Sequence, residues 1–256
     1  MRRSAAAHVV RHGLGMYIAA GVAWLRLERP ETGNRITLEL AQALCDAAAE
    51  IELDDRVAVV VLAAAGASFC LGVEDSGEWE RRVDWVEALA RLTRPVIAAI
   101  QGDAIAEGFE LALACDLRVV SSRARFAMPH ITLGRLPSHG GTQRLPRVVG
   151  RMRALDLLLT GRSFDATEAE MIALASRVAP PEAFGQALDA LVEVLKSKGP
   201  IALRYAKEAV LKGSDLTVDQ GIRLEEDLYV LLQTTQDRRE GIAAFLKKRK
   251  PVFKGK

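Results

Sequence analysis

The residue best placed to do chemistry is Glu110, an acid within a run of apolar residues. It belongs to the sequence VIAAIQGDAIAEGFELALACDL, which spans residues 96–117. The apolar, β-branched first part of this sequence, between Pro95 and Gly102, predicts a buried strand. A turn of small residues then leads into a short apolar helix over 109–114, which places Glu110 in a first helical turn.

The chemistry of such a corner follows from its backbone. A strand, a tight turn and a helix N-terminus bring backbone N–H groups and the positive end of a helix dipole to one place. That place suits the binding of developing negative charge, with Glu110 beside it as a general acid or base. The alternative is an ordinary strand–helix corner in which Glu110 is a solvated or capping residue, and the local pattern leaves both open.

The elements that must position this corner are predicted to alternate between strands and helices. Alternating runs over 16–20 and 22–27 predict a β-hairpin around Gly21. Thr37 is a suitable N-cap for a helix that runs to about Leu53. Further elements are predicted as a strand over 57–62 that is buried on both faces, a helix over 78–92, a strand over 116–121, helices over 141–149 and 151–159, a helix that Asp165 and Glu168 begin with a capping box, and helices throughout from Pro181.

This order of elements predicts an α/β core that is followed by a helical region. We expect an N-terminal tail over 1–15, the core over 16–195 and the helical region over 196–256. The basic leader, which has no acid before Glu28, leaves a cleaved transit peptide as an alternative to a frayed tail. It is short and contains little serine, which favours the tail.

Composition narrows the class of protein. The net charge of +2 gives no reason to expect a nucleic-acid partner, and no apolar run is long enough to cross a bilayer. Three widely spaced cysteines, Cys45, Cys70 and Cys115, lie in apolar contexts. They predict reduced thiols of a cytoplasmic protein and neither a disulfide framework nor a metal site.

Five linked segments resemble successive motifs of the enoyl-CoA hydratase/isomerase (crotonase) family. The resemblance runs from about Tyr17 to the C-terminus in the family's order. It implies an α/β fold of the ClpP/crotonase type, a right-handed spiral of ββα units, with C-terminal helices that assemble trimers or hexamers. It also implies acyl-CoA substrates and no cofactor beyond the coenzyme A of the substrate. The segments are GASFCLGVED, TRPVIAAIQGDAIAEGFELALACDLRV, ARFAMPHITLGRLPSHGGTQRLPRVVG, LLLTGRSFDATEA and REGIAAFLKKRKPVF.

The resemblance implies an oxyanion hole, two backbone N–H groups that hold the thioester oxygen as it gains enolate charge. At the matching positions these are the N–H groups of Leu71 and Glu107. The family has a glycine where this chain has Glu107, and glycine adopts backbone conformations that are costly for other residues. We therefore expect Glu107 to strain or narrow the hole.

Glu110 matches the first of two glutamates with which the family's hydratases place and split a water molecule. The second glutamate would follow Pro129, where this chain has His130. His130 either takes over this acid–base role, since imidazole titrates near neutrality, or only lines the pocket. A third possibility is that Glu107 replaces the missing glutamate, because residues three apart on a helix face each other and one carboxyl pKa of such a pair is raised.

The matching positions also suggest where coenzyme A binds. The acyl and pantetheine arms are expected past Arg35 and along the loop from Cys70 to Asp75. The adenine end is expected near Phe245 and either Lys247 or Lys248 of the basic tail. The full set of expected substrate-binding residues is Arg35, Cys70, Leu71, Val73, Glu74, Asp75, Ile105, Gly108, Pro129, Leu133, His139, Phe245 and Lys248.

These residues predict an enoyl-CoA hydratase that adds water across a 2-enoyl-CoA. An enoyl-CoA double-bond isomerase with Glu110 as its single base is the first alternative. The second is a hydrolase of carbon–carbon bonds in β-diketones or acyl-CoA that uses His130 and His139. A catalytically silent acyl-CoA-binding scaffold is the third, because two family positions are changed.

Overall fold

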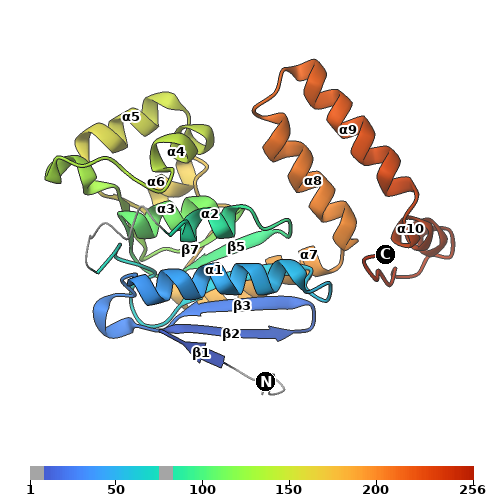
Figure 1. Ribbon diagram of the computed structural model, residues 1–256, viewed down its shortest axis with the longest axis horizontal. Coiled ribbons are helices and arrows are strands. Elements are labelled where there is room, and N and C mark those ends of the chain that lie inside the picture. Colours follow the sequence, from blue (N-terminus) through green and yellow to red (C-terminus); the bar gives the residue numbers. More distant parts are fainter. Residues whose placement is uncertain (1–8, 75–82) are drawn as a thin grey trace.

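The computed structural model describes residues 9–74 and 83–256, which form an α/β core and a group of C-terminal helices (Figure 1). The main sheet has seven strands in the order β1-β2-β3-β4-β5-β7-β10. β1, β2 and β3 pair in antiparallel fashion, and the pairs from β3 onward are parallel. These strands are β1 (Val9–Arg11), β2 (Leu14–Ala19), β3 (Val22–Leu27), β4 (Val59–Ala64), β5 (Val96–Ile100), β7 (Leu117–Ser121) and β10 (Arg177–Ala179).

The two faces of this sheet are covered by different helices. On one face, inward side chains of β3, β4 and β5 pack with α1 (Leu38–Leu53) in the large core cluster. On the other face, the alternate side chains of these strands pack with Leu188, Leu191 and Val192 of α7 (Pro181–Lys196). Both faces of β4 are thus covered, as its continuous apolar run predicts.

The N-terminal end of the chain differs from the prediction. Residues 9–15 were expected in a tail, but they form β1 and the beginning of β2. A two-residue turn joins these strands, and His12 (φ 51°) and Gly13 (φ 82°) both have the positive φ that a type I′ hairpin turn requires. The tail prediction was wrong here because backbone pairing with β2, rather than burial of Val9 and Val10, orders this segment.

A second, three-stranded sheet lies next to the corner that carries Glu110. Its strands, in the order β6-β8-β9, are β6 (Ala104–Ile105), β8 (Arg125–Ala127) and β9 (Phe164–Asp165). The remaining helices of the core are α2 (Trp85–Ala90), α3 (Glu107–Ala114), α4 (Gly141–Val149), α5 (Arg151–Thr160) and α6 (Ala166–Met171).

Two predicted helix starts are confirmed by the hydrogen bonds of their N-cap side chains. The Thr37 side chain accepts the Leu40 N–H at the start of α1, and Asp165 accepts the Glu168 N–H at the start of α6. The Glu168 carboxylate itself binds the Arg162 guanidinium, so its strongest partner is this cation. Of the helix predicted over 78–92, residues 83–92 are described, and they contain the shorter α2.

The last three helices, α8 (Pro200–Gly213), α9 (Val218–Gln233) and α10 (Gln236–Leu246), extend away from the sheet (Figure 1). Lys207 fixes α8 to the core, because its Nζ lies 2.7 Å from Asp116 Oδ2 and donates to the Arg94 carbonyl. α8 buries none of its residues, and Leu228 is the buried residue of α9. In the described part of the chain no helix combines the length and the apolar character needed to cross a membrane.

Candidate active site

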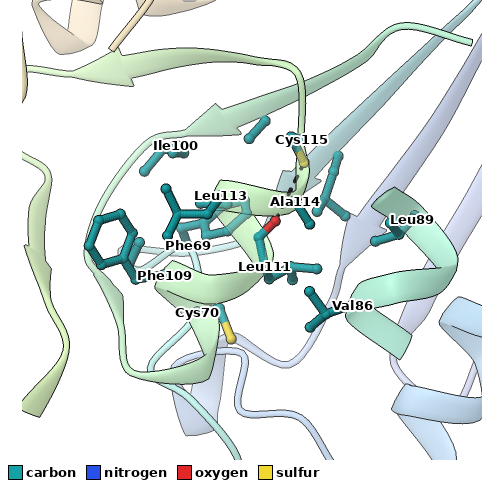
Figure 2. Close-up of a cluster of buried hydrophobic side chains, with 14 of the residues drawn as sticks. Phe69, Cys70, Val86, Leu89, Ile100, Phe109, Leu111, Leu113, Ala114 and Cys115 are labelled. Carbon is teal, nitrogen blue, oxygen red and sulfur yellow. Dashed lines mark hydrogen bonds between the residues drawn. The ribbon is translucent and has the colours of Figure 1, made fainter. Parts of the chain in front are cut away.

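Helix α3 is held deep in the core, and all eight of its residues are buried. Phe109 packs against Phe126 and Phe164 at ring-centroid distances of 5.3 and 5.8 Å. Figure 2 shows Phe109, Leu111 and Leu113 among the buried side chains around this helix. A Cβ at Gly108 would lie 2.1 Å from the Cys70 carbonyl oxygen, so glycine lets the start of α3 approach the loop over 69–73.

The strained residue of this corner is Ala106. Its φ is 53° and its ψ is −124°, a conformation that favours glycine. Glu107 follows as the first residue of α3, and its φ is not positive. The expectation of a strained backbone at Glu107 was therefore wrong, because the turn into the helix is made one residue earlier.

Three titratable side chains meet in the core at the start of α3. Glu107 and Glu110 come from α3, and His130 comes from a short 3₁₀ helix (Pro129–Leu133) that follows β8. His130 Nε2 lies 3.2 Å from Glu107 Oε1 and 3.7 Å from Glu110 Oε2, and all three residues are buried. The structure thus brings together the three predicted catalytic residues, whose side chains share one small volume.

One carboxylate oxygen of Glu110 is fixed and the other is available. Oε1 accepts the N–H groups of His139 and Gly141, each at 2.8 Å. Oε2 is buried and has no hydrogen-bond partner among the described residues. Burial raises the pKa of Glu110 above its ordinary value, with a smaller contribution from the Glu107 charge, although the two N–H groups and His130 oppose the shift.

Glu107 has the opposite electrostatic character. Burial would raise its pKa, but the hydrogen bond to His130, its own backbone N–H and the Val73 N–H outweigh burial, so the pKa of Glu107 is lowered. Its Oε2 accepts the Val73 N–H at 3.3 Å. The pKa values of the two glutamates are therefore shifted in opposite directions, down for Glu107 and up for Glu110.

The prediction for the Leu71 N–H was wrong. This group donates to the Gly33 carbonyl oxygen at 3.0 Å and is engaged within the loop. A short parallel bridge joins this loop to Ile36. In the bridge the Gly72 carbonyl oxygen accepts the Ile36 N–H, and the Glu74 N–H donates to the Ile36 carbonyl oxygen. Val73 lies between Gly72 and Glu74, and its N–H consequently points the other way, toward Glu107.

Several expected substrate-binding residues shape this loop. The Arg35 guanidinium donates to the carbonyl oxygens of Leu71 and Val73 at 2.7 and 3.2 Å. Cys70 is fully buried, and burial raises the pKa of its thiol to about 12. Glu74 is exposed and forms an ion pair with Arg29. Asp75 lies outside the described residues.

The other expected residues divide into near and distant ones. Ile105 and Pro129 flank the cluster in sequence and are half-buried, whereas Leu133 is exposed. The His139 ring packs against Trp85 at 5.0 Å, and burial lowers its pKa. Phe245 lies in the last turn of α10 and Lys248 follows that helix, and both are exposed. Within one chain, α10 lies far from α3 (Figure 1).

Arg135 is a residue of the site that the sequence did not indicate. Its Nη2 lies 3.9 Å from Glu107 Oε1, on the side of the carboxylate that faces His130. No local pattern marks this arginine, because its approach to Glu107 depends on the path of the 130–140 loop. Arg135 therefore brings a positive charge to the edge of the cluster.

The cluster is also compatible with a metal ion in its geometry. Glu107, Glu110 and His130 each offer one ligand atom, and these atoms lie within 4.8 Å of one another. A glutamate and a histidine can also transfer protons to and from water without a metal ion. That the protein has no metal site stays a prediction. Two cavities lie elsewhere: one of about 810 Å³ between the N-terminal hairpin and α1, and one of about 970 Å³ between α2, α4 and α8.

The chain matches the enoyl-CoA hydratase/isomerase family model over residues 17–256. It is 40% identical over 245 residues to a protein of Rhizobium meliloti named probable enoyl-CoA hydratase, covering 91% of this chain and 94% of the relative. It is 34% identical over 245 residues to (E)-benzylidenesuccinyl-CoA hydratase of Thauera aromatica, covering 91% and 96%.

Solved structures agree with the sequence relatives. The crystal structure of enoyl-CoA hydratase from Bacillus anthracis superposes with a TM-score of 0.92 at 34% identity, covering 96% of this chain and all of that chain. An enoyl-CoA hydratase structure from Geobacillus kaustophilus gives 0.89 at 36% identity, covering 95% and 98%. The crotonase fold that the motifs implied is confirmed, and this chain belongs to the enoyl-CoA hydratase/isomerase family.

Proposed function

We propose that this protein is an enoyl-CoA hydratase that adds water across the double bond of a 2-enoyl-CoA. The observation that carries the proposal is the unpartnered Oε2 of Glu110, which is buried beside His130 Nε2 at the start of α3. A carboxylate oxygen without a partner in the core is costly unless a ligand binds it. A water molecule at this oxygen, within reach of His130, would satisfy it.

The site supports the following sequence of steps. The backbone N–H groups of Val73 and Glu107 hold the thioester oxygen, and the dipole of α3 adds to the stabilisation of the enolate. Glu110 orients the water and accepts its proton as the oxygen attacks C3. The enolate then takes a proton at C2 from the Glu110–His130 pair, which restores the starting protonation state. A raised Glu110 pKa suits this exchange, since a group that both accepts and returns a proton works best near the operating pH.

Double-bond isomerisation is the second candidate, and one observation favours it. Glu110 alone presents an unpartnered carboxylate oxygen in this cluster, and a single base is enough to move a proton between two carbons. By contrast, the geometry gives no support to a hydrolase that uses the His139 side chain. The His139 backbone N–H holds Glu110, while its ring packs against Trp85.

We further propose a homotrimer, with pairing into a hexamer as an extension. The support is that α8 and α9 expose apolar side chains that a single chain leaves uncovered, and stable oligomers bury such surfaces. These side chains are Val210, Leu211, Ile222, Tyr229, Val230 and Leu231. The buried thiols of Cys70 and Cys115 are in keeping with a cytoplasmic location.

The test is a turnover assay on crotonyl-CoA and a panel of branched and cyclic enoyl-CoAs, with products identified by mass spectrometry. We expect a 3-hydroxyacyl-CoA, and we expect Glu110→Gln to lower kcat by at least about a hundredfold, because general acid–base catalysis contributes that much. His130→Gln should lower kcat as well. Shifted alkenes without hydroxyacyl product would replace the hydratase with the isomerase, and wild-type protein that binds acyl-CoA without turnover would exclude both.

A further inference from the structure

The Glu107 carboxylate binds one of the two N–H groups that are proposed to hold the thioester oxygen. Its Oε2 accepts the Val73 N–H at 3.3 Å, and this N–H is one of the two proposed oxyanion donors. A Cβ built on Gly72 would lie 2.7 Å from the same oxygen, so the carboxylate lies directly against the loop backbone. The side chain is 96% buried, which leaves water little access to this position.

The second proposed donor, the Glu107 N–H, lies at the start of the same helix. Glu107 begins α3, so its N–H has no acceptor within the helix. This N–H favours the ionised form of the residue's own carboxylate. The Val73 N–H therefore donates to a negative charge that the chain itself supplies, and the positive end of the α3 dipole lies beside this charge.

A route for displacement is also present. The other oxygen of Glu107, Oε1, lies 3.9 Å from Arg135 Nη2 and 3.2 Å from His130 Nε2. The Arg135 side chain is 36% exposed, so it borders the cluster from the solvent side. Rotation of the carboxylate toward Arg135 would exchange the Val73 N–H for a guanidinium partner and empty the hole.

We propose that Glu107 is an internal ligand of the oxyanion hole: its carboxylate fills the hole in the resting protein, and the thioester oxygen binds only when it displaces the carboxylate toward Arg135. The proposal rests on the proposed function in that the displacing group is an acyl-CoA thioester. It assigns Glu107 a positioning role that lowers the affinity for thioesters. Free coenzyme A lacks the thioester carbonyl, so it can bind without displacing the Glu107 carboxylate.

Two substitutions separate this role from a structural one. Glu107→Gly removes the carboxylate and keeps both backbone donors, and Glu107→Gln keeps the shape and removes the charge. Glu170→Gln is the matched control, because Glu170 is an exposed acid on α6, away from the cluster. Butyryl-CoA, a saturated thioester that cannot be hydrated, and free coenzyme A serve as ligands in calorimetric titrations.

We expect the affinity for butyryl-CoA to rise about tenfold in Glu107→Gly, because a site that is open in one molecule of ten binds with a tenfold weaker apparent constant. Glu107→Gln should show a smaller gain, and Glu170→Gln no change. The affinity for free coenzyme A should stay the same in all variants. An unchanged or weaker affinity of Glu107→Gly for butyryl-CoA overturns the proposal.

A second measurement tests the resting state without any ligand. In protein labelled with ¹⁵N-valine, the Val73 amide proton should move upfield in Glu107→Gln, because a neutral acceptor replaces a charged one. A Val73 signal that stays in place or moves downfield overturns the proposal. If the Val73 signal moves upfield but the protein binds no CoA compound, the role of Glu107 in the hole is supported and the acyl-CoA function is contradicted. Failure of the Glu107 proposal can therefore be told apart from failure of the proposed function.

Discussion

At the scale of single residues, the central feature is a pair of glutamates with opposite tendencies on one helical turn. Both are buried, but Glu107 is surrounded by hydrogen-bond donors, whereas Glu110 keeps one oxygen without a partner. The same sequence spacing therefore produces two different carboxyl groups. Their surroundings, supplied by Val73, His130 and the 139–141 loop, decide which carboxyl pKa is lowered and which is raised.

The raised pKa of Glu110 has a consequence for stability. Its folded-state pKa lies above the ordinary value of 4.5, so the folded protein binds more protons than the unfolded chain as pH rises through this range. Stability from this group is present at low pH and is lost as pH increases through the raised pKa. We therefore expect Glu110→Gln to gain thermal stability relative to the wild type as pH rises from about 4 to about 7.

Melting temperatures of the two proteins across this pH range check the sign. Glutamine retains an oxygen that can accept the His139 and Gly141 N–H groups, so the comparison isolates the charge. A difference that does not change with pH, or that changes in the opposite direction, would contradict the raised pKa.

At the scale of elements, the approach of α3 to the 69–73 loop depends on Gly108. A Cβ there would lie 2.1 Å from the Cys70 carbonyl oxygen, which belongs to backbone and cannot move cheaply. We expect Gly108→Ala to displace the start of α3, to lower kcat by at least about tenfold and to destabilise the fold by about 1–3 kcal/mol through overpacking.

Gly185→Ala in α7 is the control for this prediction, because a Cβ at Gly185 meets nothing within 4 Å. Alanine favours a helix interior over glycine by about 0.5–1 kcal/mol, so this variant should be neutral or more stable. Denaturant unfolding and turnover of both variants give the comparison. Equal effects of the two substitutions would show that helix propensity, and not the close approach to Cys70, is responsible.

A cap determines where α1 begins. Thr37 accepts the Leu40 N–H, and α1 covers one face of the sheet with Leu40, Leu44 and Ile51. Loss of the side-chain cap in Thr37→Ala should lower the free energy of unfolding by about 1 kcal/mol. Thr37→Ser, which keeps the hydroxyl, should recover most of this loss in chemical denaturation, and equal losses in both variants would argue against the cap.

At the scale of the whole molecule, α8 and α9 expose a group of apolar side chains. Val230 is 62% exposed on α9, within the apolar group that a single chain leaves uncovered. If a homotrimer covers this group, Val230→Asp should shift the mass measured by light scattering from a trimer or hexamer toward the monomer. A carboxylate placed in an apolar interface would be desolvated and would have no partner, which opposes assembly.

Leu53→Asp is the matched control. Leu53 is 86% exposed at the end of α1, a helix of the α/β domain that lies outside the C-terminal helical region. It should leave the mass unchanged. A wild-type protein that is monomeric at micromolar concentration would exclude the homotrimer, and so would a Val230→Asp variant that remains fully assembled.

Elements with a strong local signal could be predicted from the sequence. The cap at Thr37, the apolar run of β5 and the short helix that carries Glu110 all follow from residues close together in the chain. The linked motifs also identified the family, and they placed Glu107, Glu110 and His130 in one site. β1 was missed because its order comes from pairing with β2 rather than from an apolar pattern.

Only the tertiary structure decided which backbone groups and oxygens are available in the site. The Leu71 N–H is bound by Gly33 and the Val73 N–H is turned inward by the bridge to Ile36, which are partners more than thirty residues away. The positive φ at Ala106, rather than strain at Glu107, likewise follows from how the turn meets β8. Sequence determines propensity and chemistry locally, whereas the direction of a donor depends on which distant strand or loop already binds its neighbours.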